Sequence, residues 1–303
     1  MFTLAHLSDV HLSPLPRPKV RELMSKRMLG YANWLRDRHE VHSRKALDAL
    51  TADLGAQDTS HIAVTGDLVN IGLPAEFEAA LDWLHSLGAP DEVTVVPGNH
   101  DAYVKLHYDT GIGMWRDFMS ADLDASPEHA RSAQGFPFVR IRNPVAMIGL
   151  SSAVPTLPFM AAGRLDKVQL DVLPSLLRTL REQELFRVVL IHHPPLRGLT
   201  ARHRGLQNAK RFLSILRAEG AELVLYGHNH EQALDRIETK TGPAAIVGVP
   251  SASAARAGHK SLARYNLFRI ARSGTGWRCA MTGRGLSEPG GEIGEMDQVL
   301  LLD

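Results

Sequence analysis

Short apolar runs alternate with longer amphipathic stretches along most of this chain. The runs have the length and residue types of buried strands, and the longer stretches place their apolar residues at helical spacing. The expected strands cover residues 2–9, 62–64, 93–96, 145–150, 188–191, 223–226 and 245–249. The expected helices cover residues 43–54, 75–87, 168–183 and 206–218. Such alternation predicts an α/β protein whose helices cover the faces of its sheets.

The C-terminal part follows a different pattern. Residues 263–282 are typical of a β-hairpin that turns at Ser273-Gly274-Thr275-Gly276. Residues 283–296 are rich in Gly and Glu and are expected to be irregular. Because the sequence contains neither an internal repeat nor a low-complexity linker, we expect residues 1–303 to form a single domain.

A strongly basic segment covers residues 17–45. Its apolar residues recur at helical spacing, which predicts a basic amphipathic helix, loosened at Gly30, within an insertion at about residues 14–42. These apolar residues are Val20, Leu23, Met24, Met28, Tyr31, Trp34 and Leu35. Two interpretations are open. The helix is either a cap that packs its apolar side on the domain, or a contact with an anionic membrane surface or a lipid chain.

Composition and charge restrict the class of protein. A hydrophobic content of 44% and a charged content of 22% over 303 residues are ordinary for a soluble globular enzyme. The net charge of +1 argues against a surface built to bind nucleic acid. The single cysteine, Cys279, cannot form an internal disulfide and is expected in a C-terminal strand. Since neither a signal peptide nor a run of about 18 apolar residues is visible, we expect a cytoplasmic protein.

Polar motifs with metal-ligating side chains follow five of the expected strands. They are Asp9-Val10-His11, Gly66-Asp67, Gly98-Asn99-His100-Asp101, His192-His193-Pro194 and Gly227-His228-Asn229-His230. The carboxyl ends of strands in an open α/β sheet face one crevice, so the motifs are expected to meet there. Residues two apart on extended chain leave the same face, which lets both members of a pair reach one ion. The mixture of imidazole and carboxylate groups suits Mn, Fe, Zn or Co and predicts a site for two such divalent ions.

These motifs, in this order, resemble those of the calcineurin-like metallophosphoesterases, from near residue 1 to about residue 250. The resemblance implies a four-layer αββα sandwich with two metal ions at its rim. It assigns Asp9, His11 and His230 to one ion, Asn99, His192 and His228 to the other, and Asp67 to both. It also implies that a metal-bridging hydroxide attacks phosphorus in line. His100 would stabilise the transition state or protonate the leaving oxygen, and Asp101 would orient His100.

The resemblance leaves the substrate open. The wording of the motifs favours a phosphodiesterase of the cyclic-nucleotide or glycerophosphodiester group, acting on a small phosphate ester. Residues 25–34 look like an insertion of some lipid A pathway enzymes, so the alternative is a UDP-2,3-diacylglucosamine pyrophosphohydrolase. That enzyme would sit at the inner face of the membrane and contact lipid through residues 17–45. No nucleic-acid partner is expected, since no further nucleic-acid domain follows the motifs.

The remaining candidate residues carry weaker predictions. The loop after the fourth motif offers cationic groups for a substrate phosphate, although it could equally be a solvated basic loop. These groups are His193, Arg197, Arg202, His203 and Arg204. His193 is expected either to support the metal ligands or to face the substrate. Histidines outside the motifs are expected at the surface or at helix caps, namely His6, His39, His42, His61, His85, His107, His129 and His259. A homodimer through residues 252–257 or the C-terminal hairpin is also possible.

Overall fold

Two six-stranded sheets form the centre of the protein. The computed structural model describes residues 1–122, 132, 134–256, 261–274 and 276–303. The first sheet has the order β12 (Ile293–Leu302), β11 (Gly276–Leu286), β10 (Arg264–Ser273), β1 (Phe2–Leu7), β2 (His61–Val64) and β3 (Val93–Val95). The second has the order β4 (Phe138–Arg142), β5 (Val145–Gly149), β6 (Phe186–Leu190), β7 (Leu223–Tyr226), β9 (Gly242–Gly248) and β8 (Ala233–Thr239). Strands β1, β2 and β3 are parallel, and so are β5, β6, β7 and β9.

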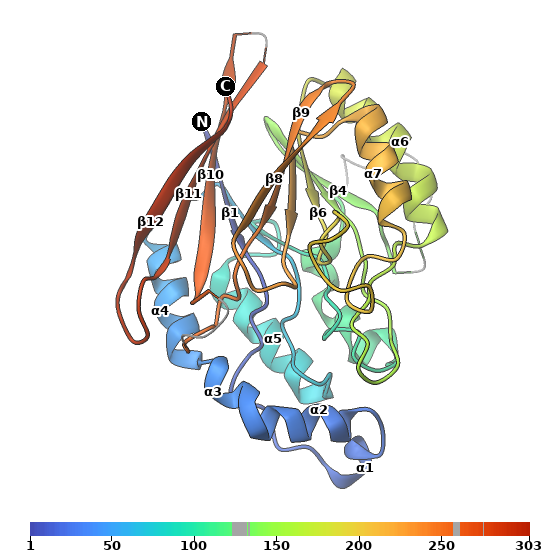
Figure 1. Ribbon diagram of the computed structural model, residues 1–303, viewed down its shortest axis with the longest axis vertical. Coiled ribbons are helices and arrows are strands. Elements are labelled where there is room, and N and C mark those ends of the chain that lie inside the picture. The colour runs from blue at the N-terminus through green and yellow to red at the C-terminus, as the bar shows by residue number, and fades with distance from the viewer. Residues whose placement is uncertain (123–131, 133, 257–260, 275) are drawn as a thin grey trace.

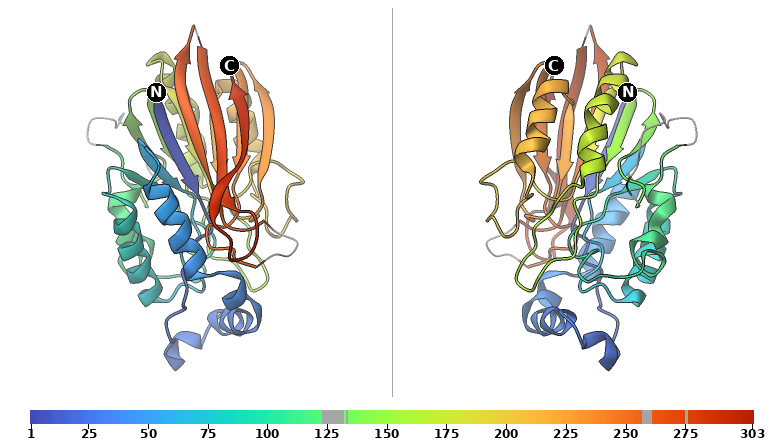
Figure 2. Two further views of the ribbon diagram at one scale, coloured as in Figure 1. Left: turned by 90° about the vertical axis from the view of Figure 1, so that its left-hand side faces the viewer. Right: turned by 90° about the vertical axis from the view of Figure 1, so that its right-hand side faces the viewer.

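Helices lie on the outer side of each sheet (Figures 1 and 2). Helices α4 (Arg44–Gly55) and α5 (Pro74–Leu87) lie outside the first sheet, and α6 (Lys167–Glu182) and α7 (Ala209–Glu219) lie outside the second. Two 3-10 segments, η2 (Tyr108–Thr110) and η3 (Ile112–Met119), follow β3. The expected α/β class and the four-layer αββα sandwich are therefore confirmed.

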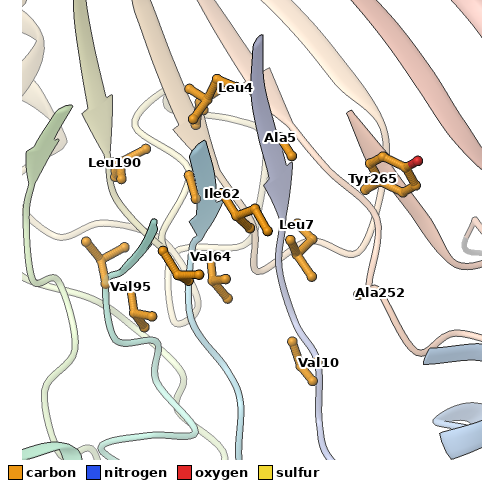
Figure 3. Packing of buried hydrophobic residues seen from close by; sticks show 14 of the residues in the cluster. Leu4, Ala5, Leu7, Val10, Ile62, Val64, Val95, Leu190, Ala252 and Tyr265 are labelled. Carbon is orange, nitrogen blue, oxygen red and sulfur yellow. The ribbon is translucent and has the colours of Figure 1, made fainter. Parts of the chain in front are cut away.

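The two faces of each strand bury different clusters of side chains. In β6, Val188 and Leu190 point into the central core between the sheets, whereas Val189 packs with the leucines of α6 and α7. Figure 3 shows Leu190 in the central core with Val64 and Val95 of the other sheet. Because successive side chains of a strand leave opposite faces, a continuous apolar run is what a strand covered on both faces requires.

The C-terminal region differs from the prediction of irregular chain over residues 283–296. Strand β11 continues to Leu286, and β12 begins at Ile293 and pairs antiparallel with it. Arg264 of β10 holds the outer strand by donating to both carboxylate oxygens of Asp297, each at 2.7 Å. Pairing partners on other strands supply this order, and local composition does not reveal them. The hairpin itself forms as expected, although Thr275 of its turn lies outside the described residues.

Other differences concern edges and helix ends. The edge strands β4 and β8 were not predicted, and β8 is mostly half-exposed, so it lacks the long apolar run of the inner strands. Helix α7 begins three residues later than expected. The side chain of Asn208 accepts from the backbone N–H of Leu165 and donates to its carbonyl oxygen. These bonds tie the residues before α7 to another loop and keep them out of the helix.

The basic insertion is a broken cap below the carboxyl ends of the strands (Figure 1). It consists of α1 (Val20–Leu23), α2 (Arg27–Asn33), the π-helical turn η1 (Trp34–Arg38) and α3 (His39–Val41). The predicted loosening at Gly30 is wrong, because Gly30 lies inside α2. A Cβ at Gly30 would lie 2.5 Å from the hydroxyl oxygen of Tyr103, so glycine is required there for close packing.

The apolar side of the cap is divided between the core and solvent. Tyr31 and Trp34 pack against a small buried cluster that includes Leu15 and Ile71, as the cap interpretation predicts. Four of the other five apolar side chains stay exposed, namely Val20 (82%), Met24 (83%), Met28 (59%) and Leu35 (51%), and Leu23 is half-buried. Within the described residues, no helix is long and apolar enough to cross a bilayer.

Candidate metal centre

The five polar motifs meet at one rim of the sandwich, where β1, β2, β3, β6 and β7 end. Backbone strain marks the same residues. Positive φ angles occur at seven non-glycine residues of the described chain, and five of these are predicted ligands. The five are Asp9, His11, Asp67, His228 and His230. Because such conformations cost free energy and collect at functional sites, the fold is evidently holding these side chains in one arrangement.

The first group of donor atoms comes from Asp9, His11 and His230. The Nε2 atom of His230 lies 3.1 Å from Asp9 Oδ1 and 3.4 Å from His11 Nε2. Asp9 and His11 are fully buried. Burial by itself would raise the pKa of Asp9, but the nearby histidines, His230 foremost, lower it well below its usual range. Asp9 is therefore a carboxylate, and the group offers one oxygen and two nitrogens.

The second group comes from Asn99, His192 and His228. Asn99 Oδ1 lies 2.7 Å from His228 Nδ1 and 3.1 Å from His192 Nε2, and these two nitrogens are 3.3 Å apart. Asp67 Oδ2 lies 3.4 Å from His192 Nε2 and 3.9 Å from His11 Nε2. One carboxylate oxygen thus stands between the two groups, in the place that a bridging ligand needs.

The donor set fits two divalent first-row ions. His11 Nδ1 lies 3.2 Å from the carbonyl oxygen of Val69, and His192 Nδ1 lies 2.6 Å from that of Thr65. Each ring therefore donates its Nδ1–H to a backbone carbonyl. Their Nε2 lone pairs therefore face the centre, as metal-binding imidazoles require. Neutral imidazole nitrogens only 3.3–3.4 Å apart repel unless a cation or a proton lies between them.

Comparison with known proteins agrees with this geometry. The calcineurin-like phosphoesterase family matches residues 2–232. The chain belongs to this family. Its members depend on two metal ions, and this chain gathers candidate His and Asp ligands at the rim.

A curated relative and solved structures extend the comparison. A probable cyclic nucleotide phosphodiesterase of Synechococcus is 31% identical over 186 residues, which is 60% of this chain and 62% of that protein. A dimetal phosphatase from Danio rerio has a TM-score of 0.62 at 14% identity and covers 99% of this chain and 98% of its own. The purple acid phosphatase PPD1 from yellow lupin has a TM-score of 0.58 at 11% identity, and the match covers 99% of this chain and 53% of the lupin chain. The two structures show the shared fold alone.

His100 lies beside the two donor groups. Its backbone N–H donates to Asp67 Oδ1 at 2.7 Å, and its ring Nδ1 lies 2.5 Å from the carbonyl of Asn70. The ring stacks on Tyr103 with 5.6 Å between centroids. Burial, and then the charge of Arg38, lower the pKa of His100 to about 4.

Asp101 does not orient His100, and that part of the prediction is wrong. Its carboxylate instead accepts four backbone N–H groups. Oδ1 accepts from Leu68 at 2.9 Å and Val69 at 3.2 Å, and Oδ2 accepts from Asp67 and Gly98, each at 2.8 Å. Asp101 therefore ties the second motif to the third and positions Asp67 through the backbone.

A cavity of about 690 Å³ opens beside the metal centre, between the cap and the loop over residues 156–161. His100 and Asn99 line it from the centre, and Arg204 lines it from the loop after the fourth motif. The other basic residues predicted for that loop do not: Arg197 lines a separate hollow, and Arg202 and His203 are exposed and absent from the cavity wall. These three side chains project from the loop into solvent, which position in the sequence could not show.

His193 packs against the second donor group. It is fully buried, and its ring packs on His228 with 4.6 Å between centroids. Ser152 Oγ lies 2.7 Å from its Nδ1, and the carbonyl of Ala161 lies 3.1 Å from its Nε2.

Several buried residues near the centre were not predicted. His42 was expected at the surface but is 3% exposed, and its ring centroid lies 4.4 Å from that of His11. Its Nδ1 lies 2.8 Å from Ser253 Oγ. His6 was also expected at the surface but is buried, with its Nε2 2.8 Å from the hydroxyl of Thr65. His61 is buried too, at the end of β2 opposite the Asp67 motif, with its Nε2 2.7 Å from the hydroxyl of Thr94. The cap also places Arg38 against the centre. The one signal in the sequence was that the cap segment begins directly after His11.

The region proposed for a dimer is largely buried. Ala252 and Ala254 are 0% and 4% exposed, and Ala257 lies outside the described residues. Residues 252–256 therefore expose little surface for the expected dimer contact. Cys279 is buried in β11, as expected for a small side chain in a C-terminal strand.

Proposed function

We propose that this protein is a phosphodiesterase that needs two divalent metal ions and hydrolyses a small phosphate diester. The observation that carries the proposal is the convergence of two donor groups on Asp67 at the edge of a cavity lined by basic side chains. Asp9, His11 and His230 would hold one ion, and Asn99, His192 and His228 the other. When bound, the ions supply charge neutralisation at the phosphate and an activated water.

The residues around the ions would place and polarise the substrate. The backbone N–H of His100 fixes Asp67, and the carbonyl of Asn70 fixes the ring of His100. Since Nδ1 of His100 is engaged, Nε2 is the ring atom left to meet the phosphate or its leaving oxygen. Arg204 would add positive charge on the wall of the cavity.

A cyclic nucleotide is the first substrate to test. The curated relative is named a probable cyclic nucleotide phosphodiesterase. A cavity of about 690 Å³ is in the range of small-ligand sites. Tyr103 and Trp34 on its wall offer aromatic surface for a nucleobase.

The test is turnover by metal-loaded enzyme, with a chelated sample as control. The panel is bis-p-nitrophenyl phosphate, p-nitrophenyl phosphate, cyclic AMP, glycerophosphodiesters and UDP-diacylglucosamine. We expect metal-dependent diester cleavage that His100→Ala reduces by about 100-fold or more. The matched control is His107→Ala, because His107 is 77% exposed and outside the cavity. Diester cleavage that survives complete chelation would contradict the proposal.

The exposed side of the cap favours a second candidate, the pyrophosphohydrolase that acts on a nucleotide-linked lipid. Met24 and Val20 project from the cap, and Phe159, 86% exposed, stands at the cavity wall. Apolar side chains among basic ones suit the surface of an anionic membrane. This candidate requires rapid UMP release from UDP-diacylglucosamine and binding to anionic vesicles that Met24→Glu weakens. If neither the wild type nor Met24→Glu binds anionic vesicles, this candidate is excluded.

A further inference from the structure

Arg38 reaches the metal centre from the cap. It is the last residue of the π-helical turn Trp34–Arg38, in which the N–H of His39 bonds the carbonyl of Trp34. Short π-helical turns inside helices are frequent at functional sites. At the start of this turn Trp34 packs on the domain, and at its end Arg38 faces His11 and His100.

The guanidinium lies over the faces of two imidazole rings. One terminal nitrogen is 3.0 Å from His100 Nε2 and 3.4 Å from His100 Nδ1. The other is 3.1 Å from His11 Nε2 and 3.2 Å from His11 Nδ1. The two lone-pair axes of an imidazole diverge, so an atom in the ring plane cannot approach both nitrogens this closely. Each terminal nitrogen of Arg38 therefore lies over the face of one ring, and because the two ring planes meet at 84°, the guanidinium bridges the two rings.

This arrangement leaves the metal-facing atom of His11 and part of the guanidinium free. The Nε2 lone pair of His11 is not used by Arg38 and stays available to a metal ion. Each terminal nitrogen of Arg38 directs an N–H at one ring and carries a second N–H. These second N–H groups are the donors that can meet two oxygens of a phosphate.

Arg38 also differs from neighbouring arginines in lacking a carboxylate. Arg36 pairs with Asp37, and Arg256 pairs with Glu40 of the cap. Among the residues that the structure describes, no Asp or Glu forms an ion pair with Arg38. Burial lowers the pKa of Arg38, with Asp67 the strongest opposing influence. A half-buried cation without a counter-charge is costly, so an anion in the cavity would be stabilised there.

We propose that Arg38 is a phosphate-binding residue, delivered by the cap, that donates to the nonbridging oxygens of the scissile phosphate. This inference rests on the proposed function in taking a phosphate ester as the ligand of the cavity. It makes the cap part of the substrate site, because Arg38 lines the cavity together with Arg204.

The test separates phosphate binding from metal binding and from turnover. Wild type, Arg38→Gln, Arg38→Lys and the control Arg44→Gln are loaded with metal, and their metal content is measured. Arg44 is a suitable control because it is exposed, pairs with Asp48 and lies outside the cavity. Inorganic phosphate is then titrated calorimetrically, and kcat and KM are measured on bis-p-nitrophenyl phosphate.

We expect Arg38→Gln to keep its metal and to bind phosphate about 10- to 100-fold more weakly, as for the loss of charge-assisted hydrogen bonds. Arg38→Lys should recover only part of this affinity, because it keeps the charge and loses the fork. Phosphate affinity equal to wild type in Arg38→Gln would overturn the inference, and so would loss of its metal. If wild type binds phosphate through Arg38 but cleaves no diester, the proposed function fails and this inference stands.

Discussion

Replacing Asp101 with Asn tests whether this residue supports the fold of the site or acts on His100. In the structure each carboxylate oxygen accepts two backbone N–H groups, at distances of 2.8–3.2 Å. Asn has the same shape but presents an NH2 group in place of one oxygen. Two buried N–H donors therefore lose their acceptor whichever way the amide turns.

The magnitude follows from these two donors. A buried donor left without a partner costs ~1–3 kcal/mol, so Asp101→Asn should lower the free energy of unfolding by ~2–6 kcal/mol. This is a large share of the total stability of an ordinary domain, which is about 5–15 kcal/mol. The loops that carry Asp67 and Asn99 should loosen, and metal affinity should fall with stability.

The assay is urea unfolding of metal-free protein, because bound metal would add its own stabilisation to the difference. Asp48→Asn is the control, since Asp48 is 55% exposed and its pair with Arg44 is a surface contact. It should change stability by less than about 0.5 kcal/mol. A variant Asp101→Asn with wild-type stability and a lowered kcat would refute the reasoning and restore the role of orienting His100.

Three further changes test other parts of the structure. Asp67→Ala should abolish retention of both metals after dialysis, measured by elemental analysis, with an unchanged circular dichroism spectrum, because both donor groups share this carboxylate. Gly30→Ala should destabilise the protein by ~1–3 kcal/mol in urea and raise KM, because its methyl group would push the cap off the domain. Burial raises the pKa of Asp53, but hydrogen bonds from Arg284 and Tyr265 outweigh it and lower the pKa. The stability that Asp53 adds over Asp53→Asn should therefore be present above about pH 5 and disappear as the pH falls below about 4.

Each of these changes has a control or an excluding result. Retention of one full equivalent of metal by Asp67→Ala would show that this residue serves a single ion. Gly55→Ala is the matched control for Gly30→Ala, because a Cβ at Gly55 meets nothing within 4 Å. Equal stability of the two variants would contradict the packing of the cap. A difference between wild type and Asp53→Asn that grows toward low pH would reverse the sign required by a lowered pKa.

The sequence by itself determined the protein family and the main layers of the fold. Each predicted ligand follows an apolar run within a few residues, so the strand positions its ligand locally, and parallel strands bring their carboxyl ends together. The alternation in β6, with Val188 and Leu190 inward and Val189 outward, likewise follows from strand geometry. Such features depend on neighbours along the chain, and the order of the motifs was enough to identify them.

Only the tertiary structure decided which groups surround these ligands. Asp101 meets backbone N–H groups more than thirty residues away, and His42 meets Ser253 across most of the chain. Arg38 is one basic residue among many in the cap, and only the folded position of the cap brings it to the centre. Strand β12 forms because β11 offers it hydrogen-bonding partners. These contacts arise from long-range packing, in which the chemical type of a residue says little about its partner until the sheets and the cap have assembled.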